Sequence, residues 1–221
     1  MNRTLLLAIL LGFAAVAFVA APFVGMYRVP LGALWQDADQ RAVSVLWTLR
    51  IPRVCLGFLA GASLALSGMA FQAMFRNPLA TPFTLGVASG ASLGAALYIR
   101  LGLAFSVLTI SGGSIFAFAG AMLSILLVYG LTRTKRGLST ATMLLAGVAM
   151  SFFFSSLILF IQYISDVKDV FVMIRWVMGG LQDTFGFNEV LSVLPFVVTG
   201  SLIVLAMTHE LNLLTTGEEL A

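Results

Sequence analysis

Long apolar runs separated by short polar segments are the dominant pattern of this 221-residue chain. An apolar run of about 20 residues is long enough for a helix to cross the hydrocarbon core of a bilayer. On this criterion the sequence predicts about six membrane-spanning helices, with approximate bounds at residues 4–25, 54–74, 83–99, 110–131, 139–164 and 190–207. The expected fold class is therefore all-α, a polytopic transmembrane helical bundle.

Residues that stop helices lie between several of these runs. A polar segment from 27 to 53 separates the first two runs, and Pro78 and Pro82, which interrupt helices, follow the second. Val170–Met178, between the fifth and sixth runs, is apolar enough to form a short helix on a surface. The first run is similar to a signal peptide, but Pro22 would block cleavage, so an uncleaved span is expected.

Composition narrows the class of protein further. Hydrophobic residues make up 60% of the chain and charged residues 10%, with a mean hydropathy of +1.05. A soluble domain carries about 25% charged residues, so a water-soluble protein is excluded and a lipid bilayer is expected around the chain. One cysteine, Cys55, and one histidine, His209, exclude an intrachain disulfide and a metal site of His and Cys clusters. No cofactor is expected, and the net charge of +3 indicates no nucleic-acid partner.

Small and polar residues recur at helical spacing inside the runs. The second run carries Gly57, Gly61, Ala65 and Gly68 on one stripe, and the third carries Gly86, Gly90 and Gly94. Because helices in lipid associate by close packing, these stripes predict tight helix contacts. The fifth run has a polar stripe instead, formed by Thr140, Gly147, Ser151, Ser155 and Gln162.

The polar stripe has two open interpretations. Polar faces of membrane helices meet protein or a water-filled path, but serine and threonine also bond to their own helix backbone. Gln72, near the end of the second run, is either a path contact or the donor of an interhelical hydrogen bond, and the bond is favoured.

Chemistry that other functions require is missing from the runs. No Asp, Glu, Lys or Arg lies inside a predicted span, so an ion-coupled carrier or channel is only the alternative hypothesis. Motifs of zinc hydrolases, serine nucleophiles and phosphate-binding loops are absent from the sequence, which counts against an enzyme. If ATP drives this protein, a separate chain hydrolyses it.

The basic residues give an unusual orientation signal. With the amino terminus in the cytoplasm, 5 of them would be cytoplasmic and 7 external, which the positive-inside rule disfavours. The cytoplasmic set is Arg3, Arg76, Arg133, Lys135 and Arg136, and the external set is Arg28, Arg41, Arg50, Arg53, Arg100, Lys168 and Arg175. Either the orientation is reversed or some external arginines have a function that outweighs this signal. Arg50 and Arg53, close to Pro52, are the candidates for such a function, and interfacial anchoring is the alternative for them.

A series of segments carries a specific residue pattern. They are Arg50–Arg53, Gly61–Gly68, Gln72, Arg76–Pro82, Leu85–Ala91, Leu138–Thr140, Leu144–Ala149, Trp176–Gly180, Leu211–Leu214 and Gly217–Ala221. This pattern closely resembles the permease subunits of binding-protein-dependent ABC importers for iron-siderophores, haem and cobalamin. It extends from Arg50 to the last residue.

The resemblance implies a function and a set of partners. The chain would form the translocation path for a ferric siderophore, or for haem or cobalamin, in the bacterial inner membrane, with its amino terminus in the cytoplasm. A periplasmic substrate-binding protein would deliver the substrate, a cytoplasmic ATP-binding subunit would drive transport, and a second permease copy or a homologue would complete the path.

The resemblance also implies residue roles. Binding-protein docking would fall to Arg50 and Arg53, whose charges would steer the encounter. The translocation path and its cytoplasmic gate would include Gln72, Asn77, Leu79, Thr140, Ala141, Gly147, Ser151, Ser155 and Gln162. Contact with the ATPase would involve Gly217, Glu218, Glu219 and Ala221, and a short external helix would lie around Val170–Gly180.

One departure from the family is large. Its members have about ten spans, and this chain stops where the family's cytoplasmic coupling helices begin. Residues 1–221 are therefore expected to form a single transmembrane permease domain that is incomplete at its carboxyl end.

Overall fold

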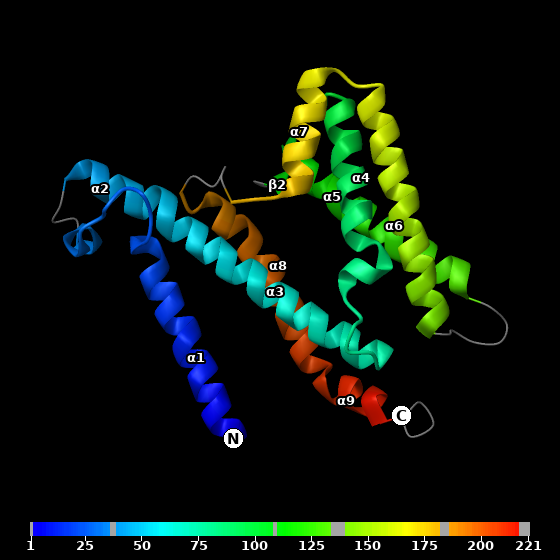
Figure 1. Ribbon diagram of the computed structural model, residues 1–221, viewed down its shortest axis with the longest axis horizontal. Coiled ribbons are helices and arrows are strands. Elements are labelled where there is room, and N and C mark those ends of the chain that lie inside the picture. The colour runs from blue at the N-terminus through cyan, green and yellow to red at the C-terminus, as the bar shows by residue number, and fades with distance from the viewer. Residues whose placement is uncertain (1, 36–38, 108–109, 134–139, 182–185, 217–221) are drawn as a thin grey trace. The chain divides into compact units, whose positions relative to one another are not determined.

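The computed structural model describes residues 2–35, 39–107, 110–133, 140–181 and 186–216. Helices dominate these residues, and the single pair of strands described is the short antiparallel pair β1 (Ser106–Val107) and β2 (Ile110–Ser111) (Figure 1). The α-helices are α1 (Arg3–Ala20), α2 (Gln40–Ser44), α3 (Ile51–Phe75), α4 (Val87–Arg100), α5 (Gly112–Thr132), α6 (Thr140–Tyr163), α7 (Val167–Met178), α8 (Asn188–Ala206) and α9 (Thr208–Thr216).

Five helical segments within these residues are long and apolar enough to cross a membrane. They are Thr4–Phe23, Gln40–Phe75, Gly112–Thr132, Thr140–Tyr163 and Asn188–Ala206. The prediction of an all-α, polytopic membrane protein is confirmed. The short helix predicted at Val170–Met178 is also present, as α7.

The third predicted span, residues 83–99, differs from the expectation of a single spanning helix. A 3-10 turn at Pro82–Leu85 is followed by α4, which has only 14 residues. At 1.5 Å per residue such a helix covers about 21 Å, less than the ~30 Å hydrocarbon core. The break falls at Gly86, whose φ of 72° is left-handed and therefore favours glycine.

The second predicted span begins earlier than residue 54. Helical structure runs without interruption from Gln40 through a π-helical turn at Val45–Arg50 into α3. Pro52 has no N–H to donate to the carbonyl of Thr48, four residues earlier. That carbonyl instead accepts a hydrogen bond of 2.7 Å from the N–H of Gly186. A partner distant in sequence thus compensates for the proline, and the helix continues through it.

The chain divides into two compact units, each with its own core. The first consists of Met1–Leu64 and Leu181–Gly200, and the second of Ala65–Gly180 and Ser201–Ala221. In the first unit a cluster of buried residues consists of Val29, Ala33, Ala42 and Leu46. The indole N–H of Trp47 donates to the Ala33 carbonyl at 3.2 Å, which ties the π-helical turn to this core.

The second unit is built around α4, which packs against α5, α6 and α7 (Figure 1). Its core includes Leu93 of α4, Phe154 and Ile158 of α6, and Met173 of α7. Met173 is 1% exposed, so α7 is attached to this unit through a fully buried side chain. The apolar segment that predicted a short surface helix therefore forms a helix that packs by its apolar face.

Close backbone contact joins α4 to α5. A Cβ atom added at Gly90 would lie 2.5 Å from the carbonyl oxygen of Gly120, and one added at Gly94 would overlap the carbonyl of Phe116. The predicted tight contacts are confirmed for these two glycines. Gly61 and Gly68 of α3, by contrast, have no atom within 4 Å of an added Cβ among the described residues.

Candidate functional site

A groove of about 510 Å³ lies between α4, α6 and α7 in the second unit. Its polar side chains are Ser89 and Ser92 of α4 and Ser155 and Gln162 of α6. Its other lining residues are Ala88, Ile158, Leu159, Ile174, Val177 and Met178. No charged residue lines it in the described part of the chain, so it combines an apolar wall with a few hydrogen-bonding groups, as ligand sites commonly do.

Three polar side chains in the groove have unused hydrogen-bonding capacity. The hydroxyls of Ser89 and Ser92 and the amide of Gln162 make no hydrogen bond among the described residues. The Ser155 hydroxyl donates to the carbonyl of Ser151 at 2.8 Å, which leaves its oxygen lone pairs as acceptors. These groups are available to orient a bound molecule.

The polar stripe predicted on α6 divides into two parts. Ser155 and Gln162 line the groove, whereas Gly147 and Ser151 pack against the turn at Gly86. A Cβ added at Gly147 would overlap the Thr84 carbonyl, and the Ser151 hydroxyl donates to the Gly147 carbonyl at 2.9 Å. Within this unit Gly147 and Ser151 therefore have packing contacts, and their path role stays a prediction.

The groove also contains residues that the sequence analysis missed. Ser89 and Ser92 belong to the third predicted span, which was interpreted only through its glycines. Their spacing of three residues places them on one face of α4. The spacing is visible in the sequence, but it identifies a groove only once the structure shows that α6 and α7 face these two serines.

The predicted gate residues lie at two helix ends. Asn77 and Leu79 follow α3, where the Asn77 side-chain oxygen accepts the N–H of Leu79 at 2.9 Å and the Leu79 side chain is 79% exposed. Thr140 and Ala141 are exposed in the first turn of α6. Their role as a gate stays a prediction, and the predicted ATPase contacts at 217–221 lie outside the described residues.

Gln72 does not form the favoured interhelical hydrogen bond among the described residues. Its side chain is exposed in the last turns of α3. A path contact is the remaining hypothesis for this residue.

Arg50 holds the turn that follows α1. Its guanidinium donates to the Pro22 carbonyl at 3.0 Å and to the Tyr27 carbonyl at 2.6 Å. A Cβ added at Gly25 would lie 2.6 Å from the Arg50 Nη2 atom, so the turn is closed around the guanidinium. Arg53 lies in the first turn of α3 and is half-buried. Docking of a binding protein by Arg50 and Arg53 stays a prediction. Arg50 also has a structural role, through its hydrogen bonds to the turn after α1.

Replacing Arg50 by lysine is expected to loosen this turn. A lysine ammonium keeps the charge but lacks the planar fork that reaches both carbonyls, and charge-assisted hydrogen bonds are worth about 1.5 kcal/mol or more. Limited proteolysis at residues 24–28 should become about tenfold faster. Arg41→Lys is the control, because Arg41 is an exposed residue of α2 in the same unit; equal rates for both variants would contradict the contact.

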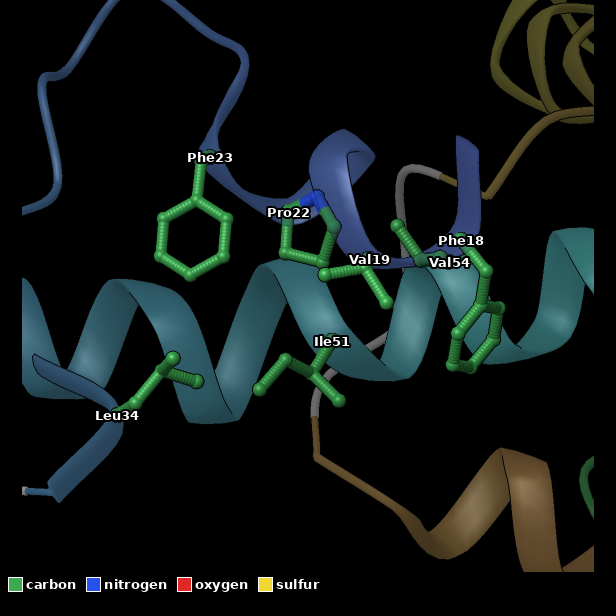
Figure 2. Close-up of a pocket in the computed structure, with 7 residues that line it drawn as sticks. All are labelled: Phe18, Val19, Pro22, Phe23, Leu34, Ile51 and Val54. Atoms are coloured by element: carbon green, nitrogen blue, oxygen red, sulfur yellow. The ribbon is translucent and has the colours of Figure 1, made fainter. Parts of the chain in front are cut away.

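A second pocket, of about 190 Å³, lies in the first unit. Figure 2 shows its lining side chains, from the end of α1, the turns that follow it and the start of α3. They are Phe18, Val19, Pro22, Phe23, Leu34, Ile51 and Val54. All are apolar, so this pocket offers no side chain that could orient a polar ligand, and the groove of the second unit is the stronger candidate site.

The helices of spanning length and the polar groove define a multi-pass α-helical membrane protein with a candidate ligand site among its helices. The chain belongs to the FecCD transport family, whose model matches residues 8–221. This is a family of transport proteins rather than enzymes, and the resemblance found in the sequence is confirmed.

Two named permease proteins are similar to this chain in sequence. It is 38% identical over 180 residues to the cobalamin import system permease protein BtuC of Halobacterium salinarum, covering 81% of this chain and 47% of the relative. It is 30% identical over 217 residues to the hemin transport system permease protein HmuU of Yersinia pestis, covering 97% of this chain and 64% of the relative.

A solved structure is also similar. It is described as an inward-facing conformation of an ABC transporter assigned to the metal-chelate type, with a TM-score of 0.76 and 29% identity. The similarity covers 99% of this chain and 65% of that one. This chain thus spans between 47% and 65% of the length of these three proteins.

Proposed function

We propose that this chain is part of the permease subunit of an ABC importer in the bacterial inner membrane. Membership of the FecCD transport family and the names of two relatives, a cobalamin and a hemin permease, support this assignment. A cytoplasmic ATP-binding subunit, a periplasmic binding protein and a second permease copy or homologue would be its partners. The amino terminus would lie in the cytoplasm.

The groove between α4, α6 and α7 carries this proposal. It contains two members of the polar stripe, Ser155 and Gln162, and two further hydroxyls, without any charged side chain. Such a lining suits a large chelate that is mostly apolar at its edges and needs few fixed contacts while it moves. The substrate class proposed is a metal chelate, either a ferric siderophore, haem or cobalamin.

The remaining roles follow from this assignment. Arg50 and Arg53 would form ion pairs with carboxylates of the binding protein and so set the docking register. The turn with Asn77 and Leu79 and the start of α6 with Thr140 and Ala141 would form the cytoplasmic gate. Residues 217–221 would approach the ATPase.

Obstruction of the groove tests the proposal. In the full transporter, Ser155→Trp should reduce ATP-dependent uptake about tenfold or more, because an indole occupies the space between α4, α6 and α7. Uptake into proteoliposomes is measured separately with cyanocobalamin, haem and a ferric hydroxamate, so the compound that accumulates also identifies the substrate.

Ser156→Trp is the matched control. Ser156 is the neighbouring residue on α6, its hydroxyl bonds to its own helix at 2.9 Å much as that of Ser155 does, and it does not line the groove. This variant should keep most of the uptake. Equal uptake by the two variants would remove the groove from the path, and no uptake of any of the three compounds by the wild type would overturn the importer assignment.

A further inference from the structure

Arg76 ends helix α3 with an unusual backbone conformation. Its φ is 49°, in the left-handed region that is unfavourable for residues with a Cβ atom. The N–H of Arg76 donates to the Ala73 carbonyl and the N–H of Asn77 to the Gln72 carbonyl, both at 3.3 Å. This pair of bonds is the Schellman arrangement, in which glycine is the usual left-handed residue.

The Arg76 side chain reaches a second helix end. Its Nε atom donates to the carbonyl oxygen of Leu214 in α9, at 2.5 Å. Leu214 lies in the last turn of α9 among the described residues. Carbonyls near the carboxyl end of a helix carry the negative end of the helix dipole and favour a cationic donor. A guanidinium is well suited to this position, because it is always charged and donates several hydrogen bonds.

One residue therefore terminates α3 with its backbone and caps α9 with its side chain. A glycine would adopt the left-handed conformation more easily, but it would leave the carboxyl end of α9 without this donor. The turn that Arg76 opens also contains Asn77 and Leu79, and it is held by the hydrogen bond from the Leu79 N–H to the Asn77 side chain. A displacement of α9 would thus be transmitted through Arg76 to a short, internally bonded turn.

We propose that Arg76 is a positioning residue that couples α9 to the gate turn at Asn77–Leu79. The coupling rests on the proposed function, in which the segment after α9 contacts the ATPase and the turn after α3 gates the path. Movement imposed on α9 by the ATPase would move the Leu214 carbonyl, and the guanidinium bound to it would move the backbone of the gate turn. The capping contact itself does not depend on the importer assignment.

Two substitutions separate the backbone of Arg76 from its side chain. Arg76→Gly removes the guanidinium and at the same time favours the left-handed turn, so the end of α3 stays intact. Arg76→Lys keeps a cation that can reach a carbonyl but has a different donor geometry, so it should retain part of the contact with the Leu214 carbonyl. Arg133→Gly is the matched control, because Arg133 is an exposed arginine at the end of another helix, α5.

Hydrogen exchange of the full chain in lipid nanodiscs tests the contact independently of transport. Amides in the last turn of α9 should exchange about threefold faster in Arg76→Gly than in wild type, because a capped helix end frays less. They should be unchanged in Arg133→Gly and intermediate in Arg76→Lys. Wild-type exchange in Arg76→Gly would overturn the capping role and the coupling together.

The ratio of substrate transported to ATP hydrolysed tests the coupling in the assembled importer. Arg76→Gly should keep its ATPase rate but transport about threefold less per ATP, a change that a purely structural defect does not produce. A proportional fall in both rates, or an unchanged ratio, would overturn the coupling. If wild type transports none of the three chelates, the proposed function fails and the coupling with it, while the exchange result still decides the capping contact.

Discussion

Replacement of Gly120 by alanine is expected to destabilise the protein by about 3 kcal/mol, through separation of α4 from α5. A Cβ at this position would overlap the carbonyl of Gly90 on the facing helix. The obstacle is backbone rather than a side chain, so no rotamer change relieves it. One of the two helices must move, and the contacts along their whole crossing are weakened.

Thermal unfolding in detergent, followed by fluorescence, measures this effect. Gly130→Ala is the control in the same helix, because no atom lies within 4 Å of an added Cβ at Gly130 among the described residues. Alanine favours helix more than glycine does, by up to about 1 kcal/mol, so this variant should unfold at or slightly above the wild-type temperature. Equal unfolding temperatures for the two variants would show that α4 and α5 are not in backbone contact.

Phe154→Ala is expected to cost about 2–3 kcal/mol and to loosen α7. The Phe154 side chain is 2% exposed and lies in the core formed by α4, α6 and α7. In lipid the apolar transfer term is small, since lipid chains are as apolar as the core. The loss of stability therefore comes from the packing contacts that disappear with the ring and from the cavity that it leaves behind.

Phe153→Ala is the control for this substitution. Phe153 precedes Phe154 on the same helix, but its ring is 54% exposed. It should change the unfolding temperature little, while Phe154→Ala should lower it and increase hydrogen exchange in α7. A larger effect of Phe153→Ala would mean that this face of α6, rather than that of Phe154, is the packed one in the protein.

The sequence was sufficient to predict the spanning helices because hydropathy depends only on local composition. α5, α6 and α8 start and end within two residues of the predicted spans. The third predicted span is the exception. Its hydropathy is that of a continuous helix, but hydropathy does not show where the backbone adopts a left-handed conformation. Gly86 divides that segment into a turn and a short helix, and the neighbouring Leu85 carbonyl accepts a hydrogen bond of 2.9 Å from the Ser124 hydroxyl.

The candidate site was predicted in part for a similar reason. The face shared by Ser155 and Gln162 follows from helical periodicity alone. Periodicity could not divide that face, because the division arises where the turn at Gly86 approaches Gly147 but not Ser155. Likewise, the arginine pattern indicated an external function for Arg50, and only the structure shows its contact with the turn after α1.

The hydrogen bond from Gly186 to the Thr48 carbonyl has a consequence for how the protein is made. The helix containing Pro52 is synthesised long before Gly186 leaves the ribosome, so during that interval the Thr48 carbonyl lacks the hydrogen bond from Gly186. An unpaired carbonyl is costly in hydrocarbon but not in water. The contact between Gly186 and Thr48 therefore closes only after residue 186 has been synthesised, which makes it a late step of biogenesis.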